Sequence, residues 1–127
     1  MRVVLFTSAE PLYLPRYLQP IFETHADTID QVVIAPFDTS TVEELRSQAV
    51  MYGASAGIRM ALRYGRCRAL DALLGQVVRR VTGRYHSVPT VARAHGVPVE
   101  RIPDVSDPAF VERMEALAPD LLLSIVA

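Results

Sequence analysis

Four short apolar segments, separated by stretches with helical spacing, most constrain the fold of this chain. RVVLF at residues 2–6 and DQVVIAPF at 30–37 are rich in β-branched side chains, which is typical of strands buried on both faces of a parallel sheet. Within HGVPVERIPDV, Gly96 predicts the end of a helix and a third segment follows it, and the fourth segment is LLLSIVA at residues 121–127. Because strands and helices alternate along 127 residues, we predict one α/β domain with a parallel sheet.

Helical spacing and capping residues predict the connecting helices. After the first strand, apolar residues recur every three or four positions: Leu14, Tyr17, Leu18, Ile21 and Phe22. Pro15 suits a first helical turn, whereas Pro20 inside the pattern predicts that the helix begins later. Near the end of the chain, Asp107 can cap a helix that has Pro108 at its first position.

Residues 41–83 are too many for one connecting helix and predict a helical insertion. Its second half carries an apolar stripe: Leu70, Leu73, Leu74, Val77, Val78 and Val81. Arg59, Arg63 and Arg66 share a helical face, and residues 59–84 contain seven arginines but a single acid, Asp71. The structural interpretation of these arginines is a solvated helix face. The functional interpretation is a surface that binds phosphate, RNA or anionic lipid. Nucleic acid is not specifically favoured among these ligands, because the segment has no lysine and no regular interleaving of aromatic residues.

One short motif matches a catalytic pattern. GASAG at residues 53–57 has the G-x-S-x-G spacing of a nucleophile elbow, in which a strand, a sharp turn and a helix expose the serine hydroxyl. QAVMY would then form the strand, and Asp71 followed by His86 or His95 has the required order. The acid would lie inside a helix, however, and no glycine run for an oxyanion loop precedes the motif. A serine hydrolase that uses Ser55 is therefore a minor alternative.

Composition and spacing argue against several other classes. The formal charge of −1 gives no whole-chain argument for nucleic acid or an anionic membrane, and no apolar run approaches the ~20 residues of a membrane span. We interpret the single cysteine, Cys67, as a structural thiol. Because one cysteine cannot form a disulfide within the chain, a reducing, cytoplasmic setting is expected. His25, His86 and His95 lack metal-ligand spacing, and we expect no metal site. The loop after the first strand has neither G-x-G-x-x-G nor G-K-[ST].

Three stretches of the sequence carry a family resemblance. They are MRVVLFTS with PLYLPRYL at the start, IDQVVIAP in the middle, and the residues from YHSVPTV to LLLSIVA at the end. Within the last stretch, HGVPV at 95–99, DVSDPAF at 104–110 and PDLLLS at 119–124 occur in a fixed order. The layout resembles the N-terminal half of the formyltransferase domain that uses 10-formyltetrahydrofolate, the family of methionyl-tRNA formyltransferase and amino-sugar formyltransferases.

The resemblance implies a fold and an activity. It implies a Rossmann-like sheet of about four strands in the order 3-2-1-4, with helices on both faces and the insertion at 41–83. In the family the chain continues past the fourth strand to a folate-holding loop, a catalytic Asn-x-His, an S-L-L-P stretch and a catalytic Asp. This sequence contains no asparagine, so no catalytic residue can be assigned. We therefore expect residues 1–127 to be an incomplete domain, inactive alone, with the fourth strand at an open sheet edge.

The resemblance also implies which residues border the site. In open parallel sheets, ligands bind beyond the carboxyl ends of the strands where the strand order reverses, here between the first and fourth strands. Candidates for contact with an amine acceptor, an aminoacyl-tRNA or an amino sugar, are Thr7, Ser8 and Glu10. Candidates for contact with 10-formyltetrahydrofolate are Ser124, Val126 and Ala127. The alternative is a stand-alone α/β binding module without catalytic function.

Overall fold

The computed structural model describes residues 1–36, 41–82 and 84–125, and its elements alternate as the sequence predicts. The strands are β1 (Val3–Thr7), β2 (Ile29–Ile34), β3 (Val99–Arg101) and β4 (Leu121–Ile125). The helices are α1 (Leu14–His25), α2 (Thr41–Tyr52), α3 (Ala54–Thr82), α4 (Val88–Ala94) and α5 (Pro108–Leu117). β1 begins and ends one residue later than the segment predicted from the sequence.

The four strands form one parallel sheet in the order β3-β2-β1-β4. The Rossmann-like order 3-2-1-4 is therefore confirmed. β1 lies at the centre, with Thr7 opposite Ile34 of β2 and Ile125 of β4. The strand order reverses beside β1, so the carboxyl end of this strand is the topological switch point of the sheet.

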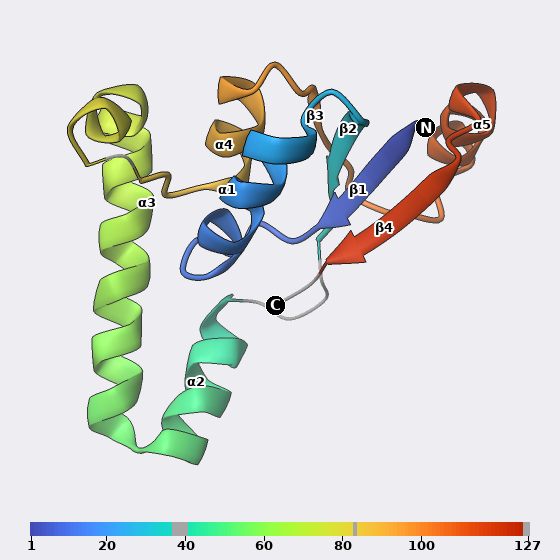
Figure 1. Cartoon of the computed structure of the whole chain (residues 1–127). Helices are drawn as coiled ribbons and strands as arrows, with labels where there is room; N and C mark the ends of the chain where they lie inside the picture. The colour runs from blue at the N-terminus through green and yellow to red at the C-terminus, as the bar shows by residue number, and fades with distance from the viewer. Residues whose placement is uncertain (37–40, 83, 126–127) are drawn as a thin grey trace.

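Helices cover both faces of the sheet (Figure 1). Successive side chains of a strand point to opposite faces, and β1 accordingly supplies both layers of the core. Leu5 packs into a cluster with α1 and α4, whereas Val4 packs into a smaller cluster with Phe110 of α5. Both side chains are almost fully buried, as predicted for a central strand of a parallel sheet.

Helix α1 runs through Pro20, so the prediction of a later start is wrong. Leu14, Leu18 and Phe22 lie one turn apart, are almost fully buried, and anchor the helix to the sheet on both sides of the proline. The proline itself is exposed, so water can solvate the carbonyl that loses its helical partner. Tertiary packing here outweighs the local preference. Pro15 lies in the first turn, as predicted.

The other predicted helix ends agree with the structure. The side chain of Asp107 accepts a hydrogen bond from the backbone N–H of Ala109 at 3.2 Å, which caps α5. Gly96 has a φ of 75° just after α4, a left-handed conformation that favours glycine and ends the helix.

The insertion is a helical hairpin, α2–α3, that projects from the layered body (Figure 1). Gly53, with a φ of 90°, separates the two helices. Gly57 is buried where they meet, and a Cβ at this position would lie 2.7 Å from the Cβ of Ala49. The G-x-x-x-G spacing therefore reflects a turn and a close helix contact. Within the described residues, no helix is both long and apolar enough to cross a membrane.

The apolar stripe predicted along residues 70–81 lies in α3, but this part of the helix is not uniformly buried. Leu73 and Val77 are exposed, and Leu70 is partly buried. The side chains of Leu74, Val78 and Val81 lie outside the described part of the structure, so for the described members the stripe predicts the helix but not its burial.

Strand β4 lies at the sheet edge, as the resemblance implies. Its register is well defined, because all five residues pair with β1. Leu121, Leu122 and Leu123 nevertheless remain 43%, 56% and 38% exposed. This exposure agrees with the open sheet edge that was expected for the fourth strand. Residues 126–127 lie outside the described part of the chain.

Candidate functional site

Two buried hydroxyl groups mark the carboxyl end of β1. Thr7 is the last residue of the strand and is fully buried, and Ser8 follows it. Thr7 Oγ1 and Ser8 Oγ have no hydrogen-bond partner among the described residues. An unpaired buried hydroxyl is destabilising by about 1–3 kcal/mol, so such groups are rare and often belong to binding sites.

Glu10 has a local structural role in the loop after β1. Its carboxylate accepts hydrogen bonds from the backbone N–H groups of Leu12, Tyr13 and Leu14 at 2.5, 2.8 and 3.0 Å. These donors include the start of α1, where N–H groups lack helical partners. Glu10 therefore fixes the path from β1 into α1, which in turn positions Thr7 and Ser8.

Ser124 lies on the strand next to the two hydroxyls. It is paired in register with Phe6, and Ile125 is paired with Thr7. Ser124 is exposed, so a ligand could reach it. The structure therefore brings Thr7 and Ser124 to the same end of neighbouring strands. The other two folate-binding candidates, Val126 and Ala127, lie outside the described residues.

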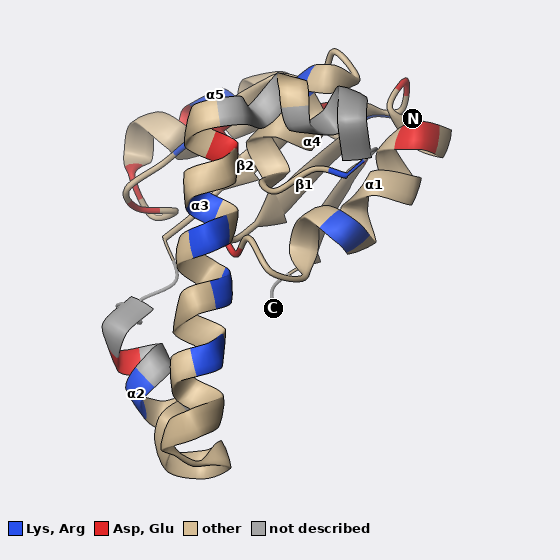
Figure 2. Ribbon diagram, turned by 90° about the vertical axis from the view of Figure 1, so that its left-hand side faces the viewer, with Lys and Arg blue, Asp and Glu red and all other residues tan. Residues whose placement is uncertain are grey.

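Figure 2 shows basic residues along α3, the helix that carries Arg59, Arg63 and Arg66. Arg59, Arg63 and Arg66 are all exposed, which agrees with a solvated or ligand-binding face. Arg63 and Arg66 line a cavity between α3 and α1, whereas Arg59 is not among its lining residues. The cavity is also lined by Arg16 and Arg84, two arginines outside the helical face predicted from the sequence. Helical spacing within α3 gave no signal for them, because they come from other segments.

Cys67 lines the same cavity and is partly exposed. Burial raises the pKa of this thiol above its ordinary value and outweighs the nearby Arg63 and Arg66, which lower it. Glu10 also raises the pKa. The sulfur is therefore held as a neutral thiol near pH 7 and is not set up as a nucleophile.

The three histidines occupy different places. His25 is the last residue of α1, and His86 lines the cavity between α1 and α3. His95 caps α4 and stacks on Phe22, with ring centroids 6.1 Å apart. Within the described residues, no group of three histidine, cysteine or acidic side chains could hold a metal ion.

The nucleophile-elbow geometry is not formed around Ser55. The segment QAVMY at residues 48–52 belongs to helix α2, so the prediction of a strand there is wrong. Ser55 is exposed near the start of α3, and Asp71 lies on the same helix. The oxygen Asp71 Oδ1 accepts a hydrogen bond from Thr90 Oγ1 at 2.8 Å. This arrangement lacks the strand that an elbow needs to present its serine.

Comparison with known proteins identifies no relative. No family model matches the chain, and neither the curated proteins nor the solved structures contain a match.

Proposed function

We propose that this chain forms the substrate-binding part of a formyltransferase-like domain, with its ligand site at the carboxyl ends of β1 and β4. The observation that carries the proposal is the pair of buried, unpaired hydroxyls of Thr7 and Ser8 at the topological switch point. A ligand that hydrogen-bonds to them would remove the desolvation penalty of both groups. The motif order along the sequence supports formyl transfer as the reaction of the parent enzyme.

The chemistry of the site is compatible with two ligands on neighbouring strands. Thr7 and Ser8 offer hydroxyl donors and acceptors to a polar acceptor molecule. The open edge of β4 offers backbone N–H and C=O groups beside exposed leucine side chains. A flat heteroaromatic ring with a hydrogen-bonding edge, such as the pterin of 10-formyltetrahydrofolate, suits that combination.

In this proposal the chain supplies binding and architecture, whereas catalytic groups come from elsewhere. In formyl transfer, the acceptor amine forms a bond to the formyl carbon and the bond from that carbon to N10 of the folate breaks. The amine must be neutral to attack, and the tetrahedral intermediate needs a donor for its oxyanion. The family uses Asn, His and Asp for these tasks, and this sequence has no asparagine.

A binding experiment tests the proposed site directly. The isotope-labelled chain is titrated with 5-formyltetrahydrofolate, a stable folate, and separately with an amino-sugar nucleotide, while backbone amide signals are followed. We expect shifts at residues 7–10 and along β4, and weaker binding in Thr7→Val. Thr28→Val is the matched control, because Thr28 lies at the opposite end of the sheet, where its carbonyl accepts a hydrogen bond from the N–H of Val3.

Either of two outcomes contradicts this assignment. One is that neither ligand shifts these amides, and the other is that Thr7→Val and Thr28→Val affect binding equally. Formyl transfer by the isolated chain would contradict the division between binding and catalysis. The coding sequence downstream of Ala127 is an independent test, because an Asn-x-His segment followed by S-L-L-P supports the enzyme.

The second candidate function is a stand-alone binding module, favoured by the well-formed sheet and the unpaired hydroxyls alone. A polar ligand that shifts residues 7–10 without any response to folate along β4 would favour it. A stop codon directly after Ala127 in the gene would favour it as well.

A further inference from the structure

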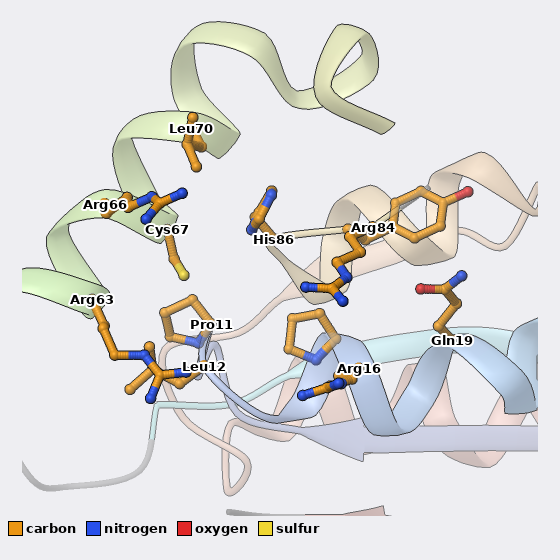
Figure 3. Close-up of a pocket in the computed structure, with 12 residues that line it drawn as sticks. Pro11, Leu12, Arg16, Gln19, Arg63, Arg66, Cys67, Leu70, Arg84 and His86 are labelled. Carbon is orange, nitrogen blue, oxygen red and sulfur yellow. The ribbon is translucent and has the colours of Figure 1, made fainter. Parts of the chain in front are cut away.

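A cavity of about 370 Å³ lies between α1 and α3, and its lining includes none of Thr7, Ser8, Glu10 or Ser124 (Figure 3). Helix α3 contributes Arg63, Arg66 and Cys67, and helix α1 contributes Arg16. The segment that leads into α4 closes the third side with residues 84–86. The cavity is therefore built from three segments that are distant in sequence, and it exists only when the hairpin packs against the body.

The lining of this cavity is strongly basic. Four of the thirteen arginines of the chain border it, together with His86, and none of the twelve lining residues that the structure describes is acidic. Among the described residues, Arg16, Arg63 and Arg66 form no ion pair. These side chains are exposed, so water screens their mutual repulsion without removing it.

Two acidic residues, Glu10 beside Cys67 and Asp71 next to Leu70 in the sequence, already accept hydrogen bonds from other groups. Glu10 is close enough to influence the Cys67 thiol, but its carboxylate accepts three backbone N–H groups. Asp71 accepts a hydrogen bond from Thr90. Neither acid lines the cavity. The charges of Arg16, Arg63 and Arg66 are therefore available to an external anion.

We propose that this cavity binds a small organic molecule that carries a phosphate group, a function independent of the proposed formyl transfer. Guanidinium groups match the geometry of phosphate oxygens and can form paired, charge-assisted hydrogen bonds with them. A bound phosphate would also relieve the repulsion among the arginines. Figure 3 shows the side chains of Arg66, Arg84 and His86 reaching into the space between α3 and α1.

The rest of the lining favours a small molecule over a nucleic acid or a membrane. Pro11, Leu12, Pro15 and Leu70 provide an apolar surface against which the carbon skeleton of a ligand can pack. Tyr85, the aromatic side chain in the lining, is 8% exposed and offers little surface for stacking an unpaired base. The volume is within the usual range for a small-ligand pocket, whereas an RNA backbone or lipid surface needs a broad basic face.

Calorimetric titration of the full chain with pyrophosphate and with AMP, at constant ionic strength, tests the proposal. The double variant R63Q/R66Q removes two cavity arginines, and we expect the dissociation constant of each probe to rise at least about tenfold. R59Q/R68Q is the matched control, because it removes the same charge from the same helix outside the cavity. We expect it to change the dissociation constant by less than about twofold, as screened surface charges do. Circular dichroism checks that both variants retain the fold.

The single thiol supplies a second readout. Cys67 lines the cavity, so bound pyrophosphate should slow its reaction with a thiol reagent in the parent chain and in R59Q/R68Q, but not in R63Q/R66Q. Equal weakening in both double variants would show diffuse electrostatic attraction and overturn the proposal. Absence of binding by both probes would overturn it too. Binding of a duplex RNA or of phosphatidylserine vesicles, without pyrophosphate binding or thiol protection, would assign the arginines to a surface instead.

Discussion

Phe22 in α1 and Leu62 in α3 are both large apolar side chains on helices, but they have very different surroundings. Phe22 is completely buried between the sheet and α4, whereas Leu62 is 68% exposed. The same contrast holds for the two regions as a whole. The layered body buries its apolar residues in two clusters on the sheet, and the α2–α3 hairpin leaves many of its own in solvent.

The comparison teaches that apolar content and helical spacing do not by themselves determine burial. In α1, Leu14, Leu18 and Phe22 are spaced by four residues and face strands that are equally apolar. The hairpin instead depends on the contact between its two helices and on contacts with the body that include the hydrogen bond from Thr90 to Asp71. We therefore expect the body and the hairpin to lose structure in separate steps.

Truncation of a core side chain should lower the free energy of unfolding more than any other change, and it should separate the body from the hairpin most clearly. Phe22→Ala removes a fully buried ring, and we expect a loss of about 3–5 kcal/mol in the free energy of unfolding. Leu62→Ala removes an exposed side chain and should change that free energy by no more than about 0.5 kcal/mol. Urea denaturation followed by circular dichroism measures both. Similar losses for the two variants would mean that the hairpin packs as tightly as the body.

Substitution of two glycines of α3 by alanine should change the stability of the hairpin in opposite directions. Gly57→Ala places a Cβ 2.7 Å from that of Ala49, and we expect about 1–3 kcal/mol of destabilisation confined to the hairpin. Gly65→Ala has nothing within 4 Å and should stabilise the helix by up to about 1 kcal/mol. Hydrogen exchange of α2 and α3 amides measures the local effect. The same sign for both variants would contradict the close helix contact.

Most of the fold could be predicted because the relevant signals are local. β-branched runs identified the strands, and Asp107 and Gly96 correctly predicted two helix ends. Pro20 does not end α1, because contacts with residues distant in sequence hold the helix together across it. The edge position of β4 depends on strand order and not on the composition of the strand, and the family resemblance rather than the local pattern implied it.

The candidate sites were less predictable, because both depend on distant segments. The sequence suggested Thr7 and Ser8 from topology, but their lack of partners is visible only in three dimensions. The resemblance predicts Glu10 as a ligand contact. In the structure its carboxylate also accepts backbone hydrogen bonds at the start of α1. The arginine cavity needs α1, α3 and residues 84–86 together, and no periodicity within one helix indicates that arrangement.

Loss of the Glu10 carboxylate should weaken the body at the candidate site. Glu10→Ala leaves three backbone N–H groups without their acceptor, and we expect about 1 kcal/mol of destabilisation, as for a lost helix cap. Glu23→Ala, which removes an exposed acid from helix α1, should be within about 0.5 kcal/mol of the parent. Thermal unfolding measures the difference. Equal shifts for the two variants would show that the loop after β1 does not depend on Glu10.

Removal of the hydrogen bond that joins the hairpin to the body should cause the smallest loss of stability. Thr90→Val removes the donor to Asp71 Oδ1, and we expect α3 to lose about 0.5–1.5 kcal/mol of docking free energy. Thr90→Ser keeps the hydroxyl and should retain the protection of α3 amides against hydrogen exchange. Because the core clusters do not involve this bond, protection of β1 and β2 should be the same in both variants. If Thr90→Val lowered the protection of the sheet and of α3 equally, the body and the hairpin would form a single cooperative unit, and the comparison between them would fail.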